Sequence, residues 1–428
     1  MTTAQKIGVF FTLFTTVFCT SIFADTSYRK WCAKWPTKFI DGGYGEDTFT
    51  AQDTYEYTPA KFAQARIRIT GEPYHFEGYL DADGCTPALL TETDTSYEFN
   101  IWYTRYRNGR NIYINAEEFA PSPAYKSKTI LIGGIASTSN VNATYTAWNS
   151  RTNLAQLAGL ALNYYSSRNW PSASVTYIST DDNPNCAVDG GTWAHENFIC
   201  INTDYVTSDS SHYDHARYKF VVAHEMGHRQ AQGVGGVGGH DTIDYSPRWP
   251  TYTEESPCNC IRNTGDPATA PGFCFRARMD VQTAAGEGWA NFYAAALLND
   301  RSSSNGYMAI WNNTYKLVYI FAIWDSTPPI QYNMLSRERW MESFCEENMP
   351  NKGIMGDWSQ FFWELWTLGS YNMDIAAISA IWDTNYDDYH TAGTEGQWGT
   401  LVDTVDDLMT NDYVLNFQNK GDATGVNH

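Results

Sequence analysis

The sequence predicts an α+β fold in which a small, antiparallel, β-sandwich-like module precedes a larger domain with a mixed sheet and a mostly helical C-terminal half. Three observations support this prediction. Residues 25–122 hold short alternating strand patterns, the middle of the chain mixes strand-like and helical runs, and helical patterns dominate beyond residue 278. The 428 residues, 43% of them hydrophobic and 15% aromatic, supply ample material for buried cores.

Residues 1–24 have the pattern of a secretory signal peptide. A single lysine, Lys6, precedes an apolar run from Ile7 to Phe18, and small residues lead to Ala24, where cleavage is expected. A membrane anchor is the alternative interpretation. However, a run of about a dozen apolar residues is too short to cross a hydrocarbon layer of about 30 Å as a helix. The sequence therefore predicts a secreted, extracellular protein.

Export makes disulfide bonds the expected state of the cysteines in the mature chain. The sequence has nine cysteines, and removal of Cys19 with the signal peptide leaves eight, an even number. Two pairs would each close a loop within one region: Cys32 with Cys85, and Cys186 with Cys200. A cysteine metal cluster is the alternative, for which the run "CNC" at 258–260 is the nearest approach to a paired motif.

The net charge of −20 excludes some classes of partner. A strongly acidic chain is repelled by nucleic acid and by anionic membrane surfaces, so neither is an expected partner. Beyond the signal peptide, no run is long and apolar enough to predict a membrane-spanning helix. We therefore expect no membrane insertion after the signal peptide is removed.

The N-terminal module, residues 25–122, is predicted from period-two alternation between turn residues. The runs are "ARIRITG" (65–71), "HFEGYLDADGCTP" (75–87) and "SYEFNIWYTRY" (96–106). The turn "GYLDADG" resembles those of transthyretin-like β-sandwich modules attached to secreted peptidases. The module is either such an accessory domain or a propeptide. The run "APSPAYKSK" (120–128) predicts a linker, so the second domain spans residues 123–428.

The second domain begins with alternating elements. Strands are predicted from "KTILIGGIAST" (128–138), "SVTYIST" (174–180) and "NFICINTDY" (197–205), and a helix from the apolar spacing within 144–168. A helix carrying "VVAHEMGHRQ" (221–230) follows, then a glycine-rich stretch, "GVGGVGGHD" (233–241). Helical patterns return with "VQTAAGEGWANFYAAALLND" (281–300) and continue beyond it. The aromatic residues after 300 are expected to pack the core, and a carbohydrate-binding surface is the alternative use.

The motif "HEMGH" carries the chemistry that the sequence predicts. Residues four apart on a helix lie on one face about 6 Å apart, so His224 and His228 can hold one metal ion between them. Zinc lowers the pKa of a bound water molecule toward about 7, and Glu225 beside this face can take the proton of that water. The motif therefore predicts a catalytic zinc site with Glu225 as the general base.

A hydrolytic zinc site takes three protein ligands, and two residues are candidates for the third. Glu287 lies in a predicted helix lined with alanines and aromatic residues, where a carboxylate needs a partner. Asn291 falls on the same face and could orient a zinc-bound histidine from behind. The alternative is His240, which would have to bend back from the glycine-rich stretch. We predict Glu287, because a helix holds its ligand without ordering a mobile segment.

The two segments "HEMGH" and, about sixty residues later, "GEGWANFYA" resemble those of the gluzincin zinc metallopeptidases, the group that includes thermolysin. The resemblance implies a zincin-like catalytic domain, a Zn2+ cofactor and a polypeptide substrate. It also implies that His224, His228 and Glu287 are the metal ligands and that Glu225 is the catalytic base. Asn291 matches a carboxylate of the family but is an amide, which changes the basicity of the orienting group.

Proteins of this group also supply a His or Tyr that stabilises the transition state, and no motif here matches it. Three candidates follow the zinc helices in sequence: Tyr371, His390 and His428. The predicted function is a secreted zinc-dependent metalloendopeptidase that hydrolyses peptide bonds with zinc-activated water. The alternative is a non-catalytic binding protein that retains a structural zinc site, although such a site would not need Glu225.

Overall fold

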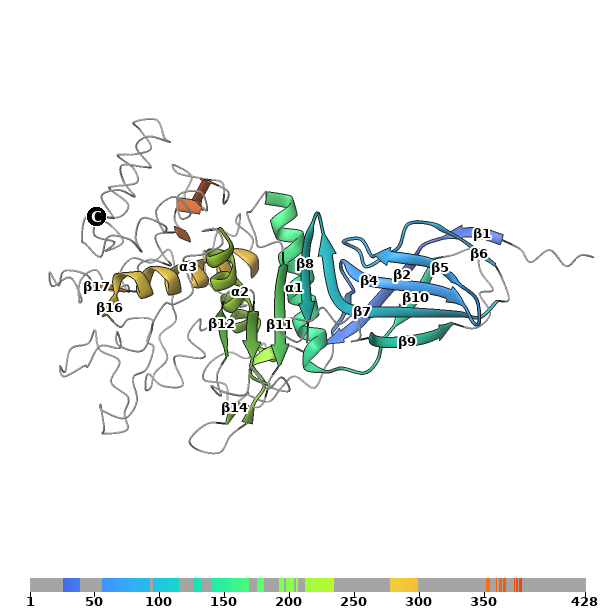
Figure 1. The fold of residues 1–428 in the computed structure, drawn as a ribbon, viewed down its shortest axis with the longest axis horizontal. Helices are drawn as coiled ribbons and strands as arrows, with labels where there is room; N and C mark the ends of the chain where they lie inside the picture. The colour runs from blue at the N-terminus through green and yellow to red at the C-terminus, as the bar shows by residue number, and fades with distance from the viewer. Residues whose placement is uncertain are drawn as a thin grey trace, which may run out of the picture.

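The structure is a computed structural model with a mixed α/β fold (Figure 1). It describes residues 26–38, 56–92, 95–114, 126–132, 140–168, 175–180, 192–195, 198–203, 205–206, 212–234, 278–298 and 352–354, with separate positions between 359 and 378. Several β-sheets and three α-helices lie in these ranges. The predicted signal peptide and most of the C-terminal half, which we predicted to be helical, lie outside them.

Eight strands lie in the described residues before position 115. They are β1 (Thr26–Arg29), β2 (Trp31–Thr37), β3 (Glu56–Pro59), β4 (Ala63–Ile69), β5 (Tyr74–Tyr79), β6 (Leu89–Glu92), β7 (Tyr97–Arg107) and β8 (Arg110–Ile114). In β4 the small and apolar residues face the core, whereas Arg66 and Arg68 face outward and pair with Glu77 and Glu98. In β4 the period-two alternation that predicted the strand therefore matches the burial of alternate side chains.

Two layers of sheet enclose an aromatic core in this region. The smaller sheet has the order β10-β2-β3, where β10 spans Val141–Thr144. Trp31 of β2 contacts the rings of Tyr97 and Phe99 on β7, with centroid distances of 5.0 and 5.8 Å. Four residues further along β2, Trp35 stacks on Tyr103. Successive inward residues of β2 therefore pack along the length of β7.

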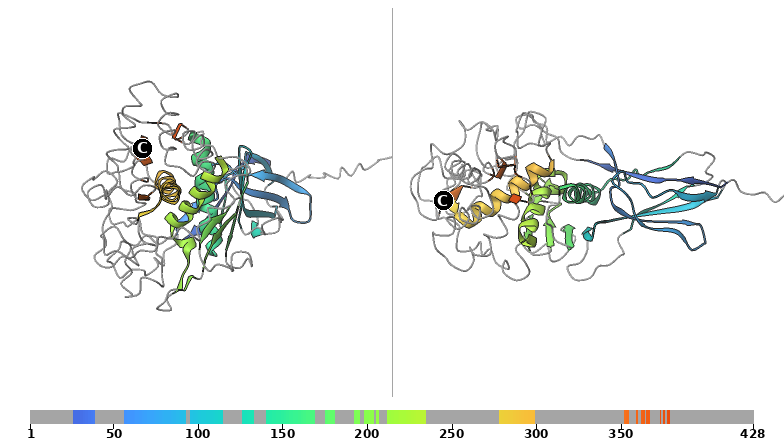
Figure 2. Two further views of the ribbon diagram at one scale, coloured as in Figure 1. Left: turned by 60° about the vertical axis from the view of Figure 1, so that its left-hand side comes forward. Right: turned by 90° about the horizontal axis from the view of Figure 1, so that it is seen from above.

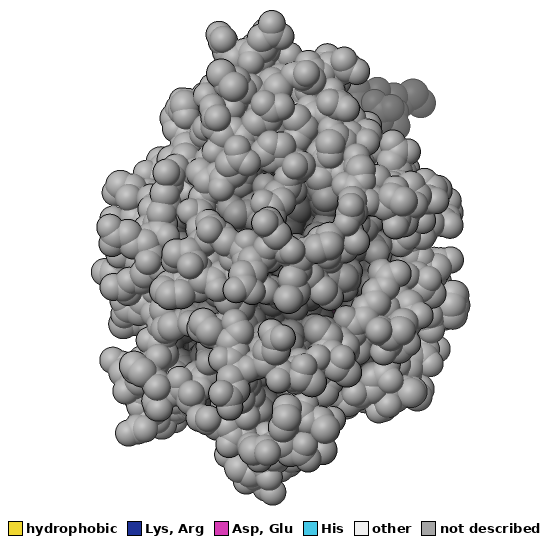
Figure 3. Space-filling view, turned by 90° about the vertical axis from the view of Figure 1, so that its left-hand side faces the viewer, with side chains coloured by type: hydrophobic (Ala, Val, Ile, Leu, Met, Phe, Trp, Pro, Cys, Tyr) yellow, Lys and Arg dark blue, Asp and Glu magenta, His cyan; other side chains and the backbone are white. Residues whose placement is uncertain are grey.

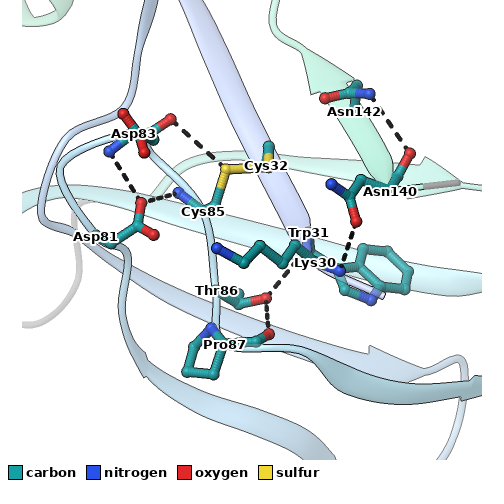
Figure 4. Close-up of a disulfide and its surroundings, with 10 residues drawn as sticks. All are labelled: Lys30, Trp31, Cys32, Asp81, Asp83, Cys85, Thr86, Pro87, Asn140 and Asn142. Atoms are coloured by element: carbon teal, nitrogen blue, oxygen red, sulfur yellow. Dashed lines mark hydrogen bonds between the residues drawn. A yellow bond between two sulfur atoms is a disulfide. The ribbon is translucent and has the colours of Figure 1, made fainter. Parts of the chain in front are cut away.

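A disulfide joins Cys32 of β2 to Cys85, which confirms the predicted pairing (Figure 4). The turn before Cys85 is held by Asp81, whose carboxylate accepts hydrogen bonds from the backbone N–H groups of Asp83 and Cys85. Cys200 is also disulfide-bonded. Its partner lies outside the described residues, so its pairing with Cys186 stays a prediction.

Among the described residues the largest sheet has eight strands, seven of them in the order β12-β13-β11-β8-β7-β4-β5. The strands new to this list are β11 (Val175–Thr180), β12 (Trp193–His195) and β13 (Phe198–Ile201), and β9 (Lys126–Ile132) is the eighth and pairs with β7. The neighbours β8, β11 and β13 are parallel and the other pairs are antiparallel, so the sheet is mixed. Strands from both predicted domains share this sheet, and the boundary near residue 122 stays a prediction. The last three residues of the predicted linker lie in β9.

The first helix is α1 (Ser150–Arg168). Asn149 caps its N-terminus, because the side chain accepts a hydrogen bond from the N–H of Thr152. One side of α1 packs on β2, β7 and β8, and the other faces α2 (Lys219–Val234) and α3 (Val281–Leu298), as the two views in Figure 2 show. One continuous hydrophobic cluster therefore runs from the N-terminal strands to α3.

Short elements complete the described part. They are β14 (Tyr205–Val206), β15 (His212–Tyr213), the 3-10 turn η1 (His215–Arg217), β16 (Arg278–Asp280) and β17 (Lys352–Ile354). On α3, Trp289 and Phe292 contact the buried rings of Phe362 and Trp366. These two aromatic residues from the later part of the chain are core residues, as expected. The space-filling view in Figure 3 shows only residues outside the described ranges. No helix in the described ranges has the length and apolar character needed to cross a membrane.

Candidate metal centre

The two histidines of the motif meet on one face of α2. Their rings lie at 89° to each other with centroids 4.6 Å apart, and the two Nε2 atoms are 3.0 Å apart. His224 is buried and His228 is nearly so. Because Nε2 of a neutral imidazole can carry a lone pair, both rings present a metal-binding atom to the same point.

A carboxylate from α3 completes the group. Oε2 of Glu287 lies 3.0 Å from Nε2 of His224 and 3.4 Å from Nε2 of His228. Tetrahedral zinc with bonds of about 2.0–2.1 Å places its ligand atoms roughly 3.3 Å apart. The three atoms therefore have the spacing of one triangular face of a zinc tetrahedron. Among the described residues, this is the group of His, Cys, Asp and Glu side chains that could share a metal ion.

A glycine allows the two helices to come this close. A β-carbon placed on Gly227 of α2 would lie 2.8 Å from the Cα and 2.9 Å from the carbonyl oxygen of Ala290 on α3. It would also lie 3.0 Å from the Cβ of Tyr293. Real β-carbons do not approach backbone atoms so closely, so only glycine fits at position 227, where α2 contacts α3 beside the three candidate ligands.

Asn291 fixes the orientation of one histidine. Its side-chain oxygen lies 2.9 Å from Nδ1 of His224, and the side chain is completely buried. When Nδ1 carries the proton and donates it to this oxygen, Nε2 is left with its lone pair facing Glu287. The amide nitrogen of Asn291 has no hydrogen-bond partner among the described residues.

Glu225 lies beside this group and is only 8% exposed. Burial raises the pKa of Glu225 to about 7; His224 opposes the shift and the charge of Glu287 adds to it. A carboxylate with a pKa near neutrality can both take up and release a proton in the physiological range.

Glu287 has the opposite electrostatic setting. In the metal-free site burial alone would raise the pKa of Glu287, but the charge of His228 and hydrogen bonds donated by both histidines lower that pKa well below the usual range. Glu287 therefore stays ionised beside Glu225, which takes a proton far more readily. Two carboxylates in one buried site thus have environments that suit different roles.

The structure brings the predicted ligands His224, His228 and Glu287 together. Glu225 interacts electrostatically with this group, and Asn291 contacts His224. The alternative ligand His240 and the candidates Tyr371, His390 and His428 lie outside the described residues. Sequence reasoning missed Gly227. The sequence did contain a signal, because a glycine inside an amphipathic helix often marks a close approach of another backbone.

Comparison with known proteins yields no match, either to a protein-family model or to a curated protein sequence.

Proposed function

We propose that this protein is a secreted zinc-dependent metalloendopeptidase. The observation that carries the proposal is the convergence of His224, His228 and Glu287 on one point, with their ligand atoms 3.0–3.4 Å apart. Two imidazoles and one carboxylate form the ligand set of hydrolytic zinc sites, which leave one position for water or substrate.

Zinc fits these residues better than harder or softer metals do. Calcium and magnesium prefer six or more oxygen ligands, whereas this group offers two nitrogen atoms and one carboxylate oxygen. The hydrogen bond from His224 to Asn291 is the outer contact that zinc-binding histidines usually have. Zinc held by the three side chains would polarise a peptide carbonyl and make water acidic enough to attack it near pH 7.

The residues of the chain supply the proton transfers. Glu225 takes a proton from the attacking water and later passes it to the nitrogen of the leaving amine, so no covalent bond to the protein forms. In the metal-free site burial raises the pKa of Glu225 to about 7, so this carboxyl group is able to hold a proton near neutral pH. Asn291 keeps the His224 ring in the orientation that binds metal throughout the reaction.

A structural zinc site in a binding protein is the competing function, and Glu225 argues against it. Burying an ionisable carboxylate destabilises a fold unless other groups compensate for the lost hydration, and a purely structural site gains nothing from a buried Glu225. A proton acceptor beside the metal ligands is useful only when a proton must move. The proposal therefore assigns α2, α3 and the mixed sheet to a zincin-like catalytic domain that acts on polypeptides.

The assay that tests this function uses the purified exported protein and a mixture of peptides or casein. We expect hydrolysis that a chelator abolishes and that one equivalent of zinc restores. Stoichiometric zinc binding without hydrolysis of any peptide in a broad library would favour the structural-zinc alternative. The disulfide between Cys32 and Cys85 supports export, because such bonds form in oxidising compartments.

A further inference from the structure

We infer that residues 26–114 are a permanent part of the folded unit that carries the metal centre and are not a removable inhibitory segment. The inference concerns the maturation of the protein and goes beyond its proposed chemistry. It rests on three sets of contacts that join the N-terminal strands to the elements that follow residue 122.

The first set is the interior position of β8 in the large sheet. Residues 111–114 of β8 pair in parallel with residues 175–178 of β11, while the other edge of β8 pairs with β7. On its far side β11 pairs with β13. Removal of residues 26–114 would therefore turn β11 from an interior strand into an edge with unpaired backbone groups. A removable segment would not be expected to occupy the middle of a sheet.

The second set runs in the opposite direction, because later residues complete the N-terminal layer. Strand β10, which follows residue 140, pairs in parallel with residues 31–34 of β2. The hydroxyl group of Tyr145 donates a hydrogen bond to the carbonyl oxygen of Phe99 on β7. Each part of the chain thus contributes strands to a sheet of the other part, and the two do not meet at a flat interface.

The third set joins the N-terminal strands to α1. The guanidinium of Arg105 donates from Nε to the carbonyl oxygen of Ala155, and Nη1 of Arg107 donates to Asn163, 2.6 Å away. A β-carbon on Gly159 would lie 3.0 Å from the carbonyl oxygen of Lys61, so α1 and the N-terminal chain touch at backbone distance. Without residues 26–114 this side of α1 would lose its cover.

One buried side chain extends this connection to the helix of the metal centre. Asn153 of α1 is completely buried and accepts a hydrogen bond from the N–H of Lys38. Its amide nitrogen donates to the carbonyl oxygens of Lys38 and of Ala216, at 2.9 and 3.2 Å. Ala216 lies in the 3-10 turn that leads into α2. The N-terminal chain is therefore linked through Asn153 to the segment that positions His224 and His228.

The test cuts the folded chain without removing anything from it. A recognition sequence for a specific protease replaces residues within 115–125, and the purified full chain is cleaved there. Cys32 and Cys85 pair with each other, so no disulfide of the described residues joins the two fragments. Gel filtration under native conditions and titration with zinc follow, and the uncut chain with the same replacement is the control.

We expect the fragments to elute together, to separate only in denaturant, and to show no loss of zinc affinity. Fragments that separate with loss of zinc binding would also support the inference, because the metal centre would then need residues 26–114. Separation with full zinc affinity in the remaining fragment would overturn it. Co-elution of the fragments does not depend on zinc or hydrolysis, so this result supports the inference even if the proposed function fails.

A second measurement uses the protein that cells export. The inference predicts that the intact mass of the protein in the culture medium includes residues 26–114, whether or not that material hydrolyses peptides. A stable, zinc-binding exported form that begins after residue 114 would contradict it.

Discussion

Gly227 on α2 and Ala290 on α3 are in backbone contact: a β-carbon on the glycine would lie 2.8 Å from the Cα of the alanine. Gly227 directly precedes the candidate ligand His228 on α2, and Ala290 lies three residues after the candidate ligand Glu287 on α3. The separation of the helices at this crossing therefore sets the distances among the three candidate metal ligands.

Replacement of Gly227 by alanine is expected to weaken zinc binding. The added methyl group meets backbone atoms that cannot rotate away, so α2 and α3 must move apart, at a cost of about 1–3 kcal/mol in the free energy of unfolding. We expect the zinc affinity, measured by competition with a chelating dye, to fall by about tenfold or more, in line with losses caused by displaced outer contacts of zinc sites.

Gly286→Ala is the matched control. Gly286 lies beside Glu287 on α3, and no described atom lies within 4 Å of a β-carbon placed there. Alanine also favours a helix over glycine by about 1 kcal/mol, so this variant should keep its zinc affinity and its stability. Equal zinc affinities for Gly227→Ala and Gly286→Ala would show that the close crossing does not position the ligands.

Asn291 is expected to act through His224. Asn291→Ala removes the acceptor 2.9 Å from Nδ1 of His224, so the imidazole loses the contact that selects its metal-binding tautomer. We expect zinc affinity to fall by about 10- to 100-fold. Asn291→Asp restores an acceptor at the same place and should retain binding. A fully retained affinity in Asn291→Ala, or a loss in Asn291→Asp as large as that in Asn291→Ala, would contradict this role.

The identity of the third ligand can be tested with two single variants. Glu287→Ala removes the carboxylate that lies 3.0 and 3.4 Å from the two histidines and should leave little zinc after dialysis against a weak chelator. His240→Ala should retain one zinc per chain. If metal analysis instead finds zinc retained in Glu287→Ala and lost from His240→Ala, the site belongs to a different zinc architecture.

The sequence predicts the centre well where spacing along one helix decides it. Residues four apart share a helix face, which is why the placing of His224 beside His228 follows from the motif alone. The approach of Glu287 depends on how two helices pack, and only its apolar surroundings in the sequence indicate that it faces inward. The close contact at Gly227 is a consequence of the packed structure.

For the strands, too, local sequence patterns predict the element but not its pairing with a distant segment. Alternation predicts β4, because one of its faces is buried, whereas residues 99–103 of β7 are buried on both faces. The pairing of β2 with β10 joins segments more than a hundred residues apart, and no local pattern specifies it.

The burial of Arg105 is a further feature that the residue type alone would not predict. It is completely buried, where its guanidinium bonds to backbone carbonyl oxygens and lies 4.2 Å from the centre of the Trp35 ring. An arginine is ordinarily expected at the surface.

His215 is expected to make the stability of the fold depend on pH. Burial lowers the pKa of His215 from 6.5 to about 4, so between these values the unfolded chain binds a proton that the folded chain does not. The free energy of unfolding should therefore be highest above pH 6.5 and fall by at most about 3 kcal/mol as the pH decreases to 4. Urea unfolding of the metal-free protein at several pH values measures this dependence.

The variant His215→Gln isolates this contribution from that of the other titrating groups. It should reduce the loss of stability between pH 6.5 and 4. The same slope in His215→Gln and the wild type would show that protonation of His215 does not oppose folding.

The central claim is that the three side chains hold zinc and that Glu225 moves the proton. Turnover of a peptide substrate by zinc-loaded Glu225→Gln tests it most directly, with the metal content determined on the same sample. The account predicts one zinc per chain, as in the wild type, and a fall in kcat of about 100- to 10,000-fold, because only the proton acceptor is lost. Turnover at the wild-type rate in the fully zinc-loaded variant would contradict the account.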